Sequence, residues 1–393
     1  MTHGPPDATP ADSGTPPLPG APGPRRHPVN GARTADAPTL PEEARPHVMP
    51  QLSPYRGAVV IRSKVRVVSD TVTALLRPEG RPRYADGVAA GVALAAPLVV
   101  GAWAGHPAIG ASVAMPAVLV AMPFPSGAGR AERARCLAAR TVGVTAAGVF
   151  VALAGSGVAA LAPGVAVAAF IGALLPRMGT TAALAVLLVG ITGDGAHPLV
   201  LPGLAQLVGC LWTAALLLPL RPATTPGDAP GRARTAGSSA AIVRHAGRLA
   251  LLSGAATVAT GWQGSLWGEG HWLVTSLLLT LQPTPEGTRT KSAKRVLGNS
   301  VGGVVAAGLL LAHPGAYAVA AVVGVSGAAA YAFRPANYAY WALASPVLLL
   351  LLSDFDESVP WYAAVVRVAL NLLGGLITVL AHRWLWPAND RVG

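Results

Sequence analysis

The chain has 393 residues, of which 52% are hydrophobic and only 12% are charged. A soluble domain carries about 25% charged residues, so this chain has too few polar groups to coat its apolar surface, and a soluble globular protein is excluded. The two cysteines, Cys136 and Cys210, lie in apolar stretches without the spacing of metal ligands. We therefore predict an all-α, polytopic membrane protein with no metal site and no other cofactor.

The N-terminal region divides into two parts. Residues 1–55 are rich in Pro, Gly, Ala and Thr and have no apolar period, so we predict a disordered cytoplasmic tail and no signal peptide. Residues 56–83 are basic, and within them residues 57–80 alternate apolar and cationic side chains. This pattern predicts an amphipathic juxtamembrane helix on an anionic membrane surface. A cytosolic cap on the first spanning helix is the alternative.

From residue 84 onward, apolar segments long enough to cross about 30 Å of hydrocarbon recur. Pro and Gly mark most of their ends. We predict about twelve transmembrane helices, at 84–104, 107–123, 136–155, 158–175, 179–194, 198–220, 241–261, 267–283, 294–313, 315–333, 336–353 and 360–386.

The charges of the predicted connections sort by side. Connections on the side of the termini carry Arg and Lys, whereas the opposite connections carry none and hold Asp194, Glu269, Asp354, Asp356 and Glu357. Cytoplasmic loops are enriched in Lys and Arg, so we expect both termini, including residues 388–393, in the cytoplasm of a bacterial cell, with the chain in its inner membrane. The net charge of +12 then reflects topology and not a nucleic-acid partner.

Two halves of the membrane region resemble each other. Residues 84–220 and 241–387 each hold six predicted spans, and residues 221–240 link them. Because six is even, both halves face the same way, which predicts a parallel repeat. The matching positions are Arg140, Gly143 and Gly148 with Arg295, Gly298 and Gly303 at an offset of 155, and Gln206 and Gly209 with Asn371 and Gly374 at 165.

Arg140 and Arg295 stand where the third and ninth predicted spans begin. A helix N-terminus has a partial positive charge and free N–H groups, so each arginine predicts an anion seat at the cytoplasmic entrance. Snorkelling at the lipid interface is the simpler alternative. Glycines that let helices approach closely are expected beside them: Gly143, Gly148, Gly298, Gly302, Gly303 and Gly374.

Polar residues inside spans are costly and are candidates for function. Arg367 lies about two turns into the last span, and Asn371 shares its face. A cation and an amide on one face predict a carboxylate site, and a structural pair of Arg367 with Asp354 or Asp356 is the alternative.

Three further polar residues are candidates. Asn299 and Gln206 are expected on the substrate pathway or in helix packing. Asp86, at the start of the first span, is a candidate for carrying a coupling proton, and a helix-start charge next to Arg83 is the alternative.

The second half carries a resemblance to a known family. The stretch "HWLVTSLLLTLQPTPEGTRTKSAKRVLGNSVGG", followed by "RPANYAYWALASPVLLLL" and "RVALNLLGGLITVLAHRWLWP", resembles the fusaric acid resistance-like (FUSC), or aromatic acid exporter, family. The first half is similar only as a degenerate repeat, with Gln206 for Asn371 and no charge in place of Arg367. The resemblance implies export of small, often aromatic, organic acids, and the related plant malate channels imply an anion channel as an alternative.

No nucleophile elbow, phosphate-binding loop or HExxH motif occurs in the sequence, so we do not predict an enzyme. The expected partners are small organic anions and the lipid bilayer, and homo-oligomerisation stays open. Apart from a channel, two alternatives remain. One is a major-facilitator-type carrier, and the other is a membrane scaffold acting through its Pro-rich tail.

Overall fold

The computed structural model of the chain describes residues 70, 72–125, 127–192, 200–220, 239–261, 267–355 and 359–384. Within these residues the secondary structure is helical, as predicted, and no strand occurs. The described residues belong to one compact unit, Val60–Gly393. The predicted tail at 1–55, the C-terminal residues 388–393 and all but the end of the linker lie outside the described residues.

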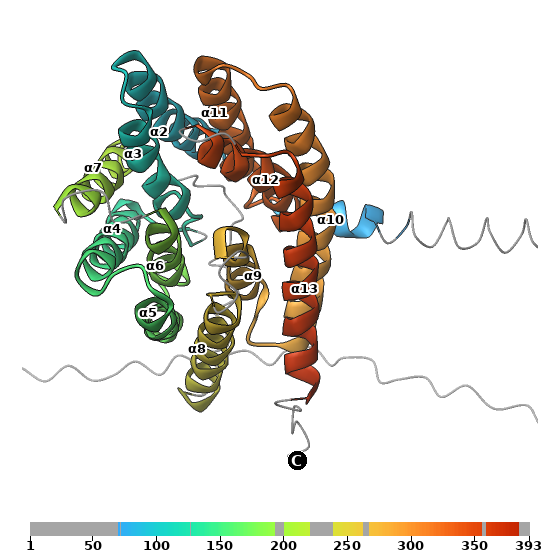
Figure 1. The fold of residues 1–393 in the computed structure, drawn as a ribbon. Coiled ribbons are helices and arrows are strands. Elements are labelled where there is room, and N and C mark those ends of the chain that lie inside the picture. Colours follow the sequence, from blue (N-terminus) through green and yellow to red (C-terminus); the bar gives the residue numbers. More distant parts are fainter. Residues whose placement is uncertain are drawn as a thin grey trace, which may run out of the picture. The chain divides into compact units, whose positions relative to one another are not determined.

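Twelve helices of the described region follow the twelve predicted apolar segments closely (Figure 1). They are α2 (Tyr84–Trp103), α3 (Pro107–Val120), α4 (Arg130–Ala154), α5 (Val158–Leu174), α6 (Thr181–Thr192), α7 (Val200–Leu217), α8 (Ser239–Gly261), α9 (Trp267–Thr280), α10 (Pro285–Leu311), α11 (Ala316–Phe333), α12 (Tyr338–Asp354) and α13 (Tyr362–Trp384).

Two helices begin well before the predicted spans do. Helix α10 begins at Pro285 and not near residue 294, because Thr284 caps it by accepting a hydrogen bond from Gly287 N and Pro285 occupies its first turn. Helix α4 begins at Arg130 and not near residue 136. In both cases a polar stretch forms the first turns of a helix whose later part is apolar, so hydropathy alone placed the start too late.

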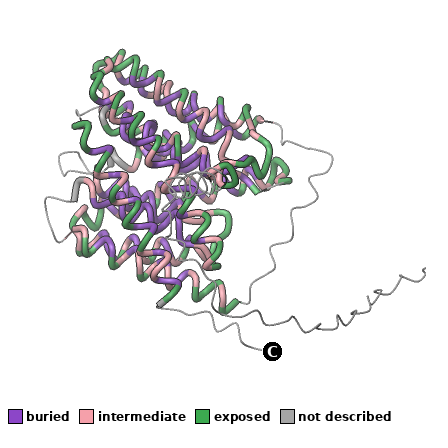
Figure 2. Tube along the Cα trace, turned by 90° about the vertical axis from the view of Figure 1, so that its right-hand side faces the viewer, coloured by how far each residue is buried: buried purple, intermediate pink, exposed green. Residues whose placement is uncertain are grey.

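The lengths and surfaces of the helices are those of a membrane protein. Four helices of the described region are long and apolar enough to cross a bilayer: Tyr84–Trp103, Arg130–Ala154, Ala316–Phe333 and the segment Tyr362–Arg383. Figure 2 shows buried positions on the sides of helices that face their neighbours and exposed positions along the outside. Large apolar side chains occupy that outside, with Leu153 79% and Val304 75% exposed. Such surfaces are stable in lipid and not in water.

The helix contacts of the two halves correspond to one another. In the first half α4 packs against α6 and α7, and α3 packs against α7; in the second half α10 packs against α12 and α13, and α9 against α13. The first helix of each half instead packs on the other half: α2 lies against α11, and α8 lies against α5. These contacts interlock helices α2–α7 with helices α8–α13.

The basic segment before α2 differs from its prediction. Residues 57–69 lie outside the described residues, and residues 72–76 are helical, but the chain leaves the helix at Arg77. Glu79 N and Gly80 N donate to Ala336 O, and Arg83 N donates to Ala332 O. The prediction of a helix continuing to residue 80 was therefore wrong, because these backbone groups bond to the turn between α11 and α12.

Candidate functional site

A line of buried polar side chains runs between α9, α10 and α13, and we call it the polar seam. Helices α10 and α13 run side by side along it (Figure 1). On α13 its members recur at four- and seven-residue intervals, which places them on one helical face. Its members are Trp272, Ser276, Thr280 and Gln282 at α9, Thr288, Ser292, Arg295 and Asn299 on α10, and Arg367, Asn371, Thr378 and His382 on α13.

At the end where α10 begins, the seam is held together by internal hydrogen bonds. Thr378 Oγ1 lies 3.4 Å from both Thr280 Oγ1 and Ser292 Oγ. A ring nitrogen of His382 lies 3.0 Å from Gln282 O. Polar groups buried in an apolar bundle need such partners, and here the helices supply them.

Arg295 lies in the middle of the seam. Its side chain is 1% exposed, its Nε donates to Asn371 Oδ1 at 2.9 Å, and its Nη1 donates to Tyr338 Oη at 3.1 Å. Arg295 lies ten residues, or about 15 Å, inside α10. The prediction that it sits at a helix N-terminus with free N–H groups was therefore wrong. The structure places it beside Asn371, a contact that sequence spacing did not reveal.

Arg367 lies one turn before Asn371 at the other end of the seam and is 0% exposed. Its Nη2 donates to Ser345 O at 3.2 Å, and its guanidinium carbon lies 3.5 Å from the centre of the Trp272 ring. Its Nε and Nη1 have no hydrogen-bond partner. The alternative pairing of Arg367 with Asp354 or Asp356 involves carboxylates outside the described side chains.

Asn299 is level with Arg367 on the facing helix. One turn before Asn299, Arg295 bonds to Asn371, and one turn after it a Cβ at Gly303 would lie 3.7 Å from Ala364 O; Asn371 and Ala364 lie about one turn to either side of Arg367, which fixes the register of α10 on α13. Asn299 is 1% exposed, and both its Oδ1 and its Nδ2 lack partners. Polar groups of the seam therefore have hydrogen-bond partners at the end where α10 begins, whereas several of those near Arg367 have none.

Two further cations lie near Arg295, at the end of the seam where α10 begins. Lys291 Nζ is 5.0 Å from the centre of the Tyr338 ring, and the Arg334 guanidinium is 4.4 Å from the centre of the Trp341 ring. Burial lowers the pKa of both cations. Neither has a carboxylate within salt-bridge distance among the described side chains, so this end of the bundle is strongly basic.

Arg140, the counterpart of Arg295, has a different role. It also lies ten residues inside its helix, so its predicted place at a helix N-terminus was wrong as well. Its guanidinium donates to the carbonyl oxygens of Val120, Met122 and Pro123, at the end of α3. Carbonyls at a helix C-terminus need donors, and Arg140 supplies one to Val120 O and others to Met122 O and Pro123 O, in the residues just after the helix.

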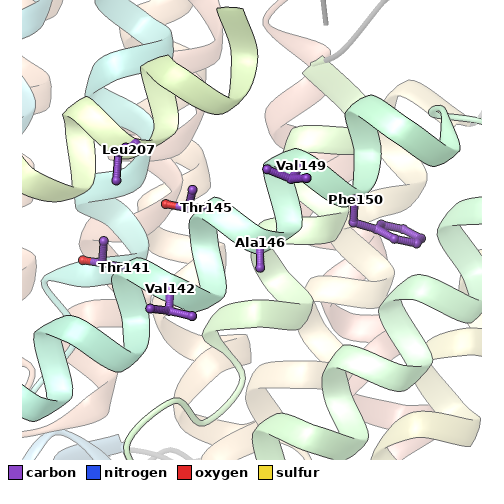
Figure 3. Close-up of a pocket in the computed structure, with 7 residues that line it drawn as sticks. All are labelled: Thr141, Val142, Thr145, Ala146, Val149, Phe150 and Leu207. Carbon is purple, nitrogen blue, oxygen red and sulfur yellow. The ribbon is translucent and has the colours of Figure 1, made fainter. Parts of the chain in front are cut away.

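Gln206, the counterpart of Asn371, is 5% exposed, and its Oε1 has no partner. The groove between α4 and α7 nearby is lined by Thr141, Val142, Thr145, Ala146, Val149, Phe150 and Leu207, which carry no charge (Figure 3). The first half therefore offers an apolar surface here and no cation comparable to Arg367.

Asp86 is held in an ion pair. Its Oδ1 accepts from Arg133 Nη2 at 2.7 Å, and Arg133, which is 2% exposed, also donates to Leu217 O. Arg83 lies 4.0 Å from the other carboxylate oxygen. These contacts favour the structural interpretation of Asp86 over the proton-carrying one. Among the exposed charges nearby, a hydrogen bond from Arg177 lowers the pKa of Glu132.

The glycines named from the sequence lie at helix contacts. A Cβ at Gly298 would meet Ala342, one at Gly302 would meet Leu343 O, and one at Gly374 would meet Ser276. Gly303 lies against Val368, while Gly143 and Gly148 lie against Met178 and Gln206 with more room. The closest approaches are thus those of α10 on α12 and of α13 on α9, the helices that carry the site.

Three residues that contact the arginines of the seam were not predicted: Trp272, Tyr338 and Ser345. Trp272 lies near the start of α9, where a Trp is ordinarily read as part of an interfacial aromatic belt, and nothing in the spacing of Tyr338 or Ser345 distinguishes them from other residues at helix surfaces. The described residues contain no group of three or more His, Cys, Asp or Glu that could hold a metal ion.

Residues 251–381 match the family model described as fusaric acid resistance protein-like. Comparisons with curated proteins and with solved structures gave no match. The matched segment contains every member of the polar seam except His382, and it confirms the resemblance predicted for the second half. A match to this family model indicates a membrane protein that acts in transport or in resistance. Residues 251–381, in the second half of the membrane region, are therefore similar to fusaric acid resistance protein-like proteins.

Proposed function

We propose that this protein exports small organic acids, aromatic acids among them, across the bacterial inner membrane along the polar seam. One observation carries the proposal: Arg295 and Arg367 are buried, and no carboxylate lies within salt-bridge distance of either among the described residues. A buried cation without a counter-charge is costly. An anionic substrate passing the seam supplies the missing charge.

The arrangement of the bundle supports the same route. Lys291 and Arg334 lie at the end where α10 begins and have no carboxylate within salt-bridge distance among the described side chains, and cationic surfaces raise the local concentration of anions. We propose that this end faces the cytoplasm, in keeping with twelve crossings, two parallel six-helix repeats and both termini inside. The matching contacts within the two halves support the repeat. We further propose that the proton gradient drives export.

The first test is flux from proteoliposomes loaded with radiolabelled benzoate or malate. We expect Arg295→Ala and Arg367→Ala each to lower flux by about tenfold or more, the value of a lost charge-assisted interaction. Arg383→Ala is the matched control, because Arg383 lies on the same helix but is exposed. Flux of both acids at the wild-type level in both seam variants would contradict the proposal.

An anion channel remains the second candidate, because a continuous seam with unpaired cations suits conduction as well as carriage. Planar-bilayer recordings separate the two. Single-channel currents of purified protein would establish a channel, whereas saturable flux that depends on an imposed pH gradient, without resolvable currents, is expected for an exporter.

A further inference from the structure

We propose that Arg367, Asn299 and Trp272 form a binding site for one planar organic carboxylate, and that the chain has one such site, in its second half only. This inference rests on the proposed function and names the position at which the substrate anion is held. Its experiment measures binding and not flux, so that the two proposals can fail separately.

The guanidinium of Arg367 is prepared to receive an anion. It has five N–H donors, and Ser345 O accepts from Nη2, while Nε and Nη1 have no partner. The remaining donors are sufficient for two parallel hydrogen bonds to a carboxylate, the strongest arrangement an arginine makes. Full burial removes competing water, which strengthens such bonds.

Trp272 fixes the plane of this guanidinium. Its ring centre lies 3.5 Å from the guanidinium carbon, and its own Nε1 donates to Glu269 Oε2 at 2.9 Å. The hydrogen bond to Glu269 holds the edge of the indole, and the guanidinium of Arg367 covers its face. The stacked pair therefore forms a flat, rigid wall. Thr275 Oγ1, one turn further along α9, is buried without a partner. A planar ligand with a carboxylate at one end and an apolar ring fits this wall better than a bulky one.

Asn299 completes the site from α10. Its amide is level with Arg367, and both its donor and its acceptor are unpaired. A buried, wholly unsatisfied amide costs free energy, and a bound carboxylate that accepts from Nδ2 removes part of that cost. The three side chains come from three helices, so the site exists only in the packed bundle.

Glu269 is the acidic group that interacts with Arg367 from beyond salt-bridge distance. Its negative charge opposes an incoming anion and partly compensates the cation while the site is empty. Replacing Glu269 with Gln keeps an oxygen that can accept from Trp272 Nε1 and removes only the charge. This variant should therefore bind anions more tightly, the opposite of what damage to the fold would cause.

The first half lacks the corresponding residues. At the repeat offsets of 155 and 165, Val144 stands in place of Asn299 and Pro202 in place of Arg367. Of the buried arginines in the first half, Arg133 pairs with Asp86, and Arg140 directs its terminal nitrogens at carbonyls at and just after the end of α3. The two halves therefore have similar helix packing, but only the second half has the residues of the anion site.

The test is isothermal titration of the purified full-length protein in nanodiscs with benzoate. We expect one benzoate per chain, about tenfold or more weaker binding in Arg367→Gln, and weaker binding in Trp272→Leu. In Glu269→Gln we expect a Kd lower by about two- to fivefold. Arg383→Gln, on the exposed side of α13, should bind as the wild type does. Benzamide, which has the same ring without the charge, should not bind.

Two benzoates per chain, no benzoate binding, or unchanged binding in Arg367→Gln would each overturn the inference. If benzoate flux persists without saturable binding at this site, the inference fails and the proposed function stands. If benzoate binds as expected but no carboxylate is transported, the proposed function fails and the site stands.

Discussion

Three buried arginines in this bundle differ in the polar partners they have, and this difference separates structural from functional residues. Arg133 is paired with Asp86, and the terminal nitrogens of Arg140 donate to carbonyls at and just after the end of α3, so that only the Nε of each lacks a partner. Arg367 has one carbonyl partner and two nitrogens without any. The sequence places the three arginines before, near the start of or inside apolar segments, but it does not show which of them have partners.

The Asp86–Arg133 pair gives a prediction at this scale. Asp86→Asn keeps an oxygen that can accept from Arg133 but removes the charge that compensates this buried cation, and losing the charged partner of a largely buried pair costs about 3 kcal/mol. We expect a clearly lower thermal unfolding midpoint in detergent, with the pH dependence of transport unchanged in the protein that remains folded.

Glu132→Gln is the control, because the Glu132 pairs with Arg135 and Arg177 are exposed and should change the midpoint little. A stable Asp86→Asn protein that had lost its response to a pH gradient would reverse this assignment and make Asp86 the proton carrier.

At the scale of single helices, α10 shows how packing is built from glycine. In lipid, helices associate through close van der Waals contact because the hydrophobic effect between them is absent. Gly298 and Gly302, four residues apart, let the backbone of α10 lie against α12. The same approach brings Tyr338 to Arg295 and Ser345 to Arg367, so the glycines position the site without touching a ligand.

Gly302→Val tests this packing. Its Cβ would overlap Leu343 O on α12, and overpacking costs about 1–3 kcal/mol, so we expect a lower unfolding midpoint and weaker benzoate binding together. Gly308→Val, on the same helix but facing open space, should change neither. Equal effects of the two substitutions would show that helix propensity, and not the α10–α12 contact, is responsible.

At the scale of the whole molecule, the exchange of first helices links the halves. Helix α2 packs on α11 through small residues: Gly87 lies against Ala328 and Ala332, and Gly324 lies against Ala95. Helix α8 packs on α5 in the corresponding way. The first helix of each half also packs on its own half, α2 on α3 and α7 and α8 on α9, but its largest contact is with the other half.

A split protein tests the exchange. We expect residues 1–238 and 239–393, expressed together as two chains, to co-purify and to transport, because the cut lies in the linker. Gly91→Leu should prevent co-purification, since its side chain would meet Gly324 and Ala328 of α11. Gly247→Leu, which meets no neighbour, should not. Either half purifying alone as a stable monomer would contradict the exchange.

The sequence by itself determined the helical class, the membrane as solvent, the approximate bounds of the helices and the family resemblance of the second half. Each follows from local quantities: apolar length, the spacing of Pro and Gly, and a run of motif residues. It also picked out Arg295, Asn299, Arg367 and Asn371 as candidates, since polar residues are conspicuous in apolar helices.

Only the tertiary structure decided what those residues touch. Arg295 contacts Asn371, and Arg140 donates to Val120 O at the end of α3. Trp272 stacks on Arg367, and α2 packs on the other half. All of these contacts depend on helix register and rotation. In lipid the outer and inner faces of a helix are both apolar, so hydropathy does not say which face meets which neighbour. That choice is made by small residues and buried hydrogen bonds between segments far apart in the chain.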